Sequence, residues 1–410
     1  MYVTIDKTLD PSVTSIRVNS TGGAFYFGHI ENGEFVADTG DIQGSSIDIS
    51  QYSGDILLGK LVMGSSIYII SSKVFAESYV NVNDSSVSTG ANNIFKGYNI
   101  KHINVKAYKT ATTSIGGMFQ SCRGLQQLDI SNFDTSLVTN MSQMFDSCYY
   151  LNQLDLSSFN TSSVTNMSHM FASCYRLQSL DLSSFNTSSV TNMMSMFSGC
   201  YSLQNLNLSN FNTSNVTAMT SMFENCHSLQ NLDLSSFSTS NVTTIQGMFA
   251  NCYSLQQVNL SSFNTGSVKS MSSTFTSCYS LRNLDISNFD TSALTKMGNM
   301  FSGCYSLQNL DLSSFNTSSV TNMSSVFDSC YTLKIAKPFQ STLTESQVTS
   351  FFDSVGLFKQ NCVYRSTYLA WCEITPNGTG TINVSSKLNY RLSDADRALL
   401  TNKGYTLTIK

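Results

Sequence analysis

The order of apolar and polar residues repeats through the middle of the chain at intervals of 26 residues. In one unit, residues 141–148 carry apolar side chains at positions i, i+3, i+4 and i+7, which form one face of about two helical turns. Residues 154–156 then alternate leucine, aspartate and leucine, which is typical of a very short strand with leucine inside. Serine, threonine and asparagine around these segments favour turns. The pattern therefore predicts a unit of strand, turn, short helix and turn.

Neither element would be stable alone, because an isolated helix shorter than roughly 12–15 residues is marginal in water. If the strands of successive units pair in parallel, about 4.8 Å apart, the apolar side chains line up in continuous inner columns. We therefore predict an α/β repeat fold, a solenoid with short parallel strands on one face and short helices on the other face.

Cysteine marks the period most clearly. Nine of the eleven cysteines stand 26 residues apart, each with phenylalanine three residues before it and leucine three residues after it. These nine are Cys122, Cys148, Cys174, Cys200, Cys226, Cys252, Cys278, Cys304 and Cys330. The close Cys-x-x-Cys spacing of zinc sites is absent, so we predict buried, reduced thiols and no metal site. Whether Cys362 and Cys372 pair with each other stays open.

The segments on either side of the repeats have other patterns, so the sequence predicts three domains. Residues 1–90 form a small all-β domain, because short apolar segments alternate there with turn-forming residues. Residues 91–338 form the repeat solenoid, and residues 339–410 form a small α/β capping domain. The strands expected in the first domain lie at residues 15–18, 24–30, 46–49 and 66–70.

Capping residues define the elements of the C-terminal domain. Thr344 and Gln347 have the spacing of a capping box for a first helix. Ser393 and Asp396 cap a last helix in the same way, and Gly404 ends it. The residues after this glycine form a closing strand.

The charge of the chain limits its partners. Only 12% of the residues are charged, with 22 basic and 26 acidic side chains and a net charge of −4. Because nucleic-acid binding needs a concentration of basic side chains, we expect no nucleic-acid partner. No run approaches the 18 apolar residues of a membrane span, so we expect no membrane insertion. The first ten residues do not resemble an export signal, so we expect the chain either to fold where it is made or to leave the cell by a route other than the general secretory one.

Motifs of common catalytic and nucleotide-binding sites are missing from the sequence. It contains neither a phosphate-binding glycine loop nor the Gly-x-Ser-x-Gly and His-Glu-x-x-His motifs. A repeat also supplies regular columns, whereas a catalytic site needs one irregular group of side chains. We therefore expect no enzymatic activity, no catalytic residue and no cofactor.

Two columns of surface residues are candidates for ligand binding. The first follows the repeat cysteines and consists of Tyr149, Tyr175, Tyr201, Tyr253, Tyr279 and Tyr305. These rings either stack on one another and cover the turn, or present their hydroxyl groups to a glycan or protein. The second column lies on the predicted strands and consists of Asp129, Asp155, Asp181, Asp233, Asp285 and Asp311. Its aspartates either belong to a solvated polar face or take part in binding a hydrogen-bonding ligand.

Two parts of the repeat resemble a known family. The spacing of Leu151, Leu154, Leu156 and Phe159 is similar to that of leucine-rich repeats. The longer pattern Met-Phe-x-x-Cys-x-x-Leu-x-x-Leu-Asp-Leu-Ser-x-Phe-Asn-Thr resembles the BspA-like subfamily of bacterial surface proteins. This resemblance implies a non-enzymatic adhesion or recognition surface and does not identify a ligand.

Three functional hypotheses follow for a recognition or structural protein. The first is a bacteriophage virion component, such as a head or tail fibre, that is assembled in the host cytoplasm and adheres to a host or a glycan. The second is a BspA-like adhesin at the bacterial cell surface, and the third is an intracellular protein–protein scaffold. The partner would be a protein or a cell-surface glycan, and the N-terminal domain would dock on a virion or surface anchor protein. Association with further copies of the chain stays open.

Overall fold

The computed structural model describes five parts of the chain. These are the strands within residues 2–83 and 102–109, a turn residue at 96, residues 113–337 except 132, four residues between 339 and 347, and residues 365–409 except 385. The chain divides into two compact units. Unit 1 comprises residues 1–190 and 196–210, and unit 2 comprises residues 191–195 and 211–410.

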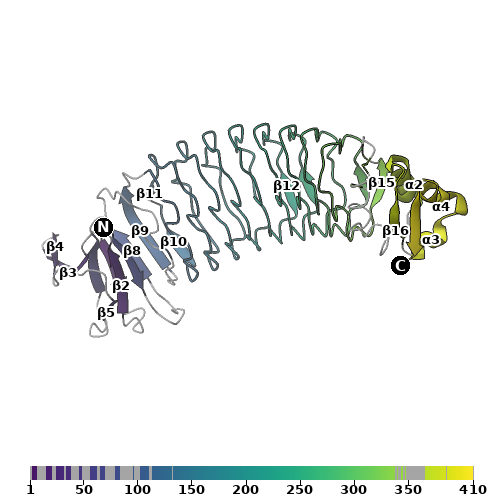
Figure 1. The fold of residues 1–410 in the computed structure, drawn as a ribbon. Coiled ribbons are helices and arrows are strands. Elements are labelled where there is room, and N and C mark those ends of the chain that lie inside the picture. Colours follow the sequence, from purple (N-terminus) through teal and green to yellow (C-terminus); the bar gives the residue numbers. More distant parts are fainter. Residues whose placement is uncertain are drawn as a thin grey trace. The chain divides into compact units, whose positions relative to one another are not determined.

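The N-terminal part of unit 1 is built from strands (Figure 1). They are β1 (Tyr2–Asp6), β2 (Ser15–Ser20), β3 (Phe25–Glu31), β4 (Glu34–Ala37), β5 (Ser46–Asp48), β6 (Ile56–Leu61), β7 (Ser65–Ile69) and β8 (Tyr79–Asn83). The strand order is β8-β1-β6-β3-β4 in one sheet and β5-β2-β7 in the other, and these pairs are antiparallel. All four strands predicted from the sequence are confirmed.

Strand β9 (His102–Lys109) connects this sheet to the repeats. It pairs in parallel with β8 on one side and with β10 (Gln127–Asp129) and β11 (Phe133–Asp134) on the other. The sheet therefore passes from the N-terminal strands into the first repeat without an interruption.

The repeats contain the predicted short parallel strands. In unit 2, β12 (Asn231–Asp233) pairs with β13 (Gln257–Asn259), and β14 (Asn309–Asp311) pairs with β15 (Lys334–Lys337). Other repeats are joined by single parallel bridges, such as the bridge between Ser179 and Asn205. The central Leu232 of β12 is buried and both flanking residues are exposed, so leucine points inward as expected.

The short helices predicted for each repeat are wrong. Residues 113–333, apart from the undescribed residue 132, form turns in place of helices. In the unit of residues 141–148, the backbone amides of Met141, Gln143 and Phe145 donate to carbonyl groups of the next repeat at 2.8–2.9 Å. The amides of Met144 and Cys148 turn back to carbonyls three residues earlier, at 3.3 and 3.1 Å. Alternate amides thus bind the next repeat, whereas in a helix every amide would bind within its own segment.

Left-handed backbone conformations make these consecutive turns. Gln143 has a φ of +58° and Ser147 has a φ of +63°. Equivalent positions hold mostly serine or asparagine, such as Ser173 and Asn225, and glycine at Gly199. Glycine and asparagine tolerate this region at the lowest cost. The same apolar residues face inward as in a helix, so the predicted burial is confirmed although the predicted conformation is not.

Columns of identical side chains form the core of each unit. In unit 2, the rings of Phe223, Phe249 and Phe275 stack with centroids 5.8 and 5.3 Å apart and are fully buried. Burying each such side chain contributes about 1.5–3 kcal/mol. Because each ring is covered by its equivalents in the adjacent repeats, this stabilisation depends on stacking.

A column of buried threonines holds the backbones of adjacent repeats together. The hydroxyl of Thr161 donates to the carbonyl of Asn186 at 2.9 Å and accepts the amide of the same residue at 2.8 Å. In unit 2, Thr239 makes the same two bonds to Asn264, both at 2.8 Å. Both threonines are at most 1% exposed. Each hydroxyl therefore satisfies one donor and one acceptor of the neighbouring backbone.

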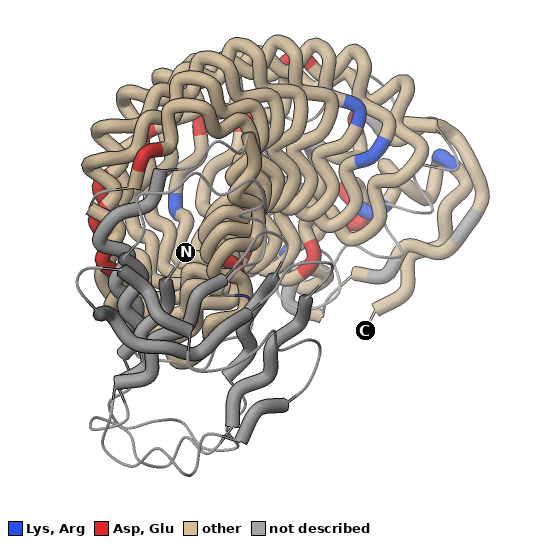
Figure 2. Tube along the Cα trace, turned by 90° about the vertical axis from the view of Figure 1, so that its left-hand side faces the viewer, with Lys and Arg blue, Asp and Glu red and all other residues tan. Residues whose placement is uncertain are grey.

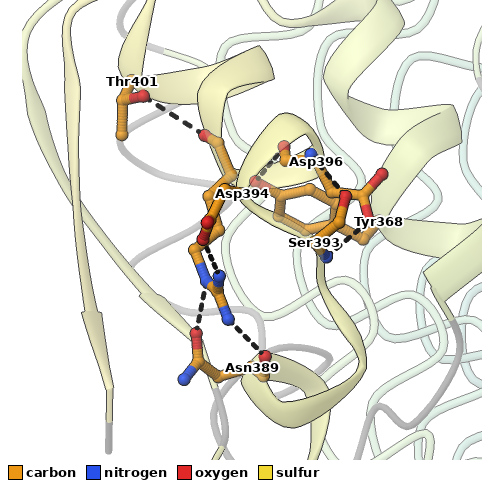
Figure 3. Close-up of polar contacts among 7 residues, drawn as sticks. Tyr368, Asn389, Ser393, Asp394, Asp396 and Thr401 are labelled. Carbon is orange, nitrogen blue, oxygen red and sulfur yellow. Dashed lines mark hydrogen bonds and ion pairs between the residues drawn. The ribbon is translucent and has the colours of Figure 1, made fainter.

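The C-terminal part of unit 2 contains helices and a two-stranded parallel sheet (Figure 1). Its elements are α2 (Arg365–Ile374), β16 (Gly380–Val384), α3 (Ser386–Arg391), α4 (Asp394–Thr401) and β17 (Tyr405–Ile409). Ser393 and Asp396 form the predicted capping box at the start of α4, as Figure 3 shows. Gly404 follows α4 with a φ of +97°, and β17 is the predicted closing strand. The mixed α/β composition of this part is confirmed.

This C-terminal part covers the last repeat. Gln347 donates to the backbone carbonyls of Thr317 and Val320 at 2.8 and 2.7 Å. The predicted capping box between Thr344 and Gln347 is confirmed by reciprocal bonds, and the helix body expected after it lies outside the described residues. Trp371 of α2 packs against the ring of Phe327 with a centroid separation of 6.0 Å. These contacts occupy the carbonyls and the ring that a further repeat would cover.

Candidate recognition surface

The tyrosines after the repeat cysteines form stacked ladders. In unit 1, the ring centroids of Tyr149 and Tyr175 are 4.4 Å apart and those of Tyr175 and Tyr201 are 4.5 Å apart. In unit 2, the separations from Tyr253 to Tyr279 and from Tyr279 to Tyr305 are 4.7 and 4.6 Å. The planes of these pairs lie within 7° of each other. The predicted stacking of the rings is therefore confirmed.

Stacking limits what the tyrosines can bind. Each inner ring has both faces against its neighbours, so only its edge and hydroxyl group face solvent. The guanidinium of Arg123 covers the first ring of unit 1, 5.2 Å from the centroid of Tyr149. Desolvation and neighbouring tyrosines raise the pKa of Tyr305 above its ordinary value. The column offers hydroxyl groups to a ligand, and it offers no ring face between its members.

The aspartate column has a role within the fold. The carboxylate of Asp155 accepts the backbone amide of Ser157 at 2.9 Å, and Asp181 accepts that of Ser183 at the same distance. The same turn occurs at Asp129, Asp233, Asp285 and Asp311, with distances of 2.9–3.1 Å. These hydrogen bonds lower the pKa of Asp155 and of Asp181. Asn207 and Asn259 make equivalent bonds at 3.1 Å, which explains why asparagine replaces aspartate in two repeats.

Other polar columns also serve the backbone. Asn160 accepts the amide of Ser162 at 3.1 Å, and Asn166 accepts the amide of Ser168 at 3.0 Å. Such turns repeat along the chain because asparagine and aspartate side chains can imitate a backbone acceptor. A polar column on this protein is therefore not by itself a binding surface.

Two adjacent columns on the strand side differ from all of these. The outer column consists of Gln126, Asn152, Gln178, Gln204, Gln230, Gln256, Arg282 and Gln308. The inner column consists of Gln127, Gln153, Ser179, Asn205, Asn231, Gln257, Asn283 and Asn309. Every side chain is exposed except that of Gln126, which is half-buried. Each compact unit carries part of both columns, and we call the part within one unit its amide face. The outer column lies outside the alternating strand segment, so the strand pattern of the sequence does not point to it.

The amide face is available to a ligand. Within the described residues, the side chains of both columns make no hydrogen bond to the protein. The large apolar side chains that are exposed elsewhere include Leu137 and Tyr150, and none of them belongs to this face. Charged residues are also sparse along the repeats (Figure 2). Of the sixteen positions, only Arg282 carries a charge. The largely exposed aspartate column stands two residues after the inner column, as Asp233 does after Asn231, so the face is polar and has a mildly acidic border.

The repeat cysteines, unlike the amide face, are buried and bonded to the backbone. The Sγ atom of Cys174 donates to the carbonyl of Phe145 at 3.2 Å, and other repeats make the same contact. Burial raises the pKa of Cys200, Cys252 and Cys304 to about 12. The predicted buried thiols are therefore confirmed. Cys372 is also a buried thiol, whereas Cys362 lies outside the described residues.

Comparison with known families places the chain. Residues 89–180, 176–280 and 254–366 each match the family described as a Mycoplasma protein of unknown function, DUF285. Together the three matches span residues 89–366, which is more than half of the chain. The chain belongs to this family. The repeat family predicted from the 26-residue pattern is thereby confirmed, and the tandem matches agree with the tandem repeats in the structure.

Comparisons with curated proteins and with solved structures give less information about this DUF285 member. Its chain matches no curated protein. A crystal structure of a leucine-rich cell surface protein from Faecalibacterium prausnitzii is similar, with 16% identity and a TM-score of 0.28, over 68% of this chain and 93% of the other. Nothing in these comparisons supports the hypothesis of a virion component.

The described residues offer neither a metal-binding group nor a membrane-spanning helix. They contain no group of three histidine, cysteine, aspartate or glutamate side chains arranged to hold a metal ion. They also contain no helix that is long and apolar enough to cross a membrane.

Proposed function

We propose that this chain is a non-enzymatic recognition protein of the bacterial cell surface, built as a leucine-rich-repeat solenoid. The main support is the amide face, because within the described residues its side chains make no hydrogen bond to the rest of the protein. Solenoids commonly bind through such repeated surfaces, since one favourable contact recurs with every repeat. The DUF285 description assigns no activity, so the support for a recognition role comes from the surface of the repeats.

The distribution of polar side chains supports a binding role over a purely structural one. Aspartate, asparagine and threonine columns elsewhere are held by hydrogen bonds to the backbone, as at Asp155, Asn160 and Thr161. A face with amides at most positions and no internal partners leaves those donors and acceptors to solvent or to a ligand.

Antibody labelling of intact cells tests the location. An antibody raised against the full chain should label intact bacteria that produce it, at a level close to that of lysed cells. Labelling that appears only after lysis would contradict a surface role and leave an intracellular scaffold. The purified full chain should also reduce attachment of such cells to their natural surface, and a screen with hydrolase substrates should show no turnover.

A further inference from the structure

The amide face indicates which class of ligand the repeats take. We propose that it binds an extended, uncharged polysaccharide, with the sugar chain lying along the stacked repeats of one unit. This inference depends on the proposed recognition role and narrows its ligand to one chemical class. Three properties of the face support it: hydrogen-bonding capacity, charge and spacing.

The hydrogen-bonding capacity fits sugars. The side-chain amides of Gln230 and Gln256, for example, each offer two N–H donors and a carbonyl acceptor, and both are exposed. A sugar hydroxyl is also both a donor and an acceptor, so each amide can bind it in either sense. The neighbouring carboxylates of Asp233 and Asp285 retain acceptor capacity beyond the serine amide that each one binds.

The charge and apolar content favour a neutral glycan over the alternatives. A polyanion would need a cluster of basic side chains, and the face has only Arg282. The centre of a typical protein–protein interface contains buried aromatic or apolar anchors. The amide face lacks exposed large apolar side chains, which disfavours a protein ligand.

The spacing favours an extended sugar polymer. The ring centroids from Tyr253 to Tyr331 in unit 2 are 4.6–5.3 Å apart, which indicates the separation of adjacent repeats near the tyrosines. An extended peptide advances about 3.3 Å per residue, so it would lose register with the repeats. An extended β-1,4-linked glycan advances by a distance close to the separation of the repeats with each sugar. Because successive sugars of such a chain are turned over relative to each other, every second sugar can meet every second repeat in an equivalent position.

A binding experiment with matched variants tests the proposal. The purified full chain is measured against soluble β-1,4-linked gluco- and N-acetylglucosamine oligosaccharides and insoluble polymers of the same sugars, with heparin as an anionic comparison. We expect binding to at least one neutral polymer, little dependence on salt, and affinity that rises with oligosaccharide length. Removing the amides in the double variant Gln230→Ala/Gln256→Ala should weaken binding by about tenfold or more, at about fivefold per hydrogen bond.

The control is a second double variant, Thr243→Ala/Gln246→Ala. Both residues are exposed but lie outside the amide face, so binding should stay within about twofold of the unchanged chain. Equal thermal midpoints for both double variants would show that folding is unaffected. Equal loss of binding in both would overturn the assignment of the face.

The outcomes separate this inference from the proposed function. One outcome is that the chain binds no neutral polysaccharide, while the antibody still labels intact cells and the chain still blocks their attachment. The assignment of a glycan ligand is then wrong, and the recognition role is retained. Binding only to heparin, with loss of binding in salt, would also contradict a neutral glycan ligand. Binding of a protein ligand through the same amides would contradict it as well. If the chain neither labels on intact cells nor blocks their attachment, both proposals fail.

Discussion

The repeats and the C-terminal part are stabilised in different ways. In the repeats, alternate backbone amides bind the neighbouring repeat, as Met141 and Phe145 do, and side chains such as Thr161 join two backbones. In the C-terminal part, α4 begins with a capping box between Ser393 and Asp396, which are only three residues apart. Short-range interactions therefore define α4, whereas the repeat has its conformation because an identical unit lies beside it.

This difference makes the consequences of mutation different as well. A residue in the repeats acts on two interfaces at once, and its loss leaves a gap in a column. A capping residue acts mainly on its own helix. Four predictions test this contrast, from the largest expected effect to the smallest.

The largest effect should come from a core ring. Phe249 stacks between Phe223 and Phe275 and is fully buried, so Phe249→Ala should lower the free energy of unfolding by about 3–5 kcal/mol. Urea unfolding followed by circular dichroism measures it. Leu400→Ala in α4 is the matched core substitution, and a larger loss there than at Phe249 would contradict the central role of the column.

A smaller effect is expected at the threonine column. Thr239→Val keeps the shape of the side chain but leaves the amide and carbonyl of Asn264 without their partner, which should cost about 1–3 kcal/mol. Thr239→Ser retains the hydroxyl and should recover most of this loss. If valine and serine give the same unfolding midpoint, the hydroxyl does not hold the repeats together.

The capping box should have a moderate and local effect. Ser393→Ala removes the acceptor of the Asp396 amide and should cost about 1 kcal/mol. Hydrogen exchange should increase in α4 and stay unchanged in residues 141–333. Faster exchange throughout the repeats would show that the two parts unfold together. It would contradict a purely local role of the capping box.

The aspartate turns should have the smallest effect, and it should depend on pH. Hydrogen bonds from Ser157 and Ser183 lower the pKa of Asp155 and Asp181 below the usual 3.8. The turns therefore contribute stability above the unfolded-state pKa, and this contribution is lost as the pH falls through the lower folded-state pKa. Asp155→Asn/Asp181→Asn should reduce the loss of stability between pH 5 and pH 2, because an amide oxygen accepts the same bond at every pH. An unchanged acid dependence of the urea midpoint would contradict this role.

Sequence reasoning succeeded where short-range chemistry decides the structure. Gly404 ends α4 because its φ of +97° is favourable only for glycine, and the spacing of Ser393 and Asp396 is sufficient to place a helix start. It failed at residues 141–148, where the spacing of apolar residues fits both a helix and a pair of turns. Only contacts with the next repeat distinguish the two conformations, and a single unit does not contain them.

Contacts between repeats also decide which candidate residues can bind a ligand, and a single unit of the sequence does not show them. The aspartates and tyrosines stood out in the sequence because they recur, yet Asp155 caps a turn and Tyr175 stacks between two rings. Gln178 and Gln204 recur as well, but their availability depends on which side chains the fold engages.

The sequence by itself determined the 26-residue period, the residues that face the core and the family to which the chain belongs, because each follows from the order of residue types. The tertiary structure alone decided that the repeats are built from turns and which polar columns are free to bind a ligand. Both depend on hydrogen bonds between residues about 25 positions apart, such as Thr239 and Asn264. Such bonds form only when the repeats stack.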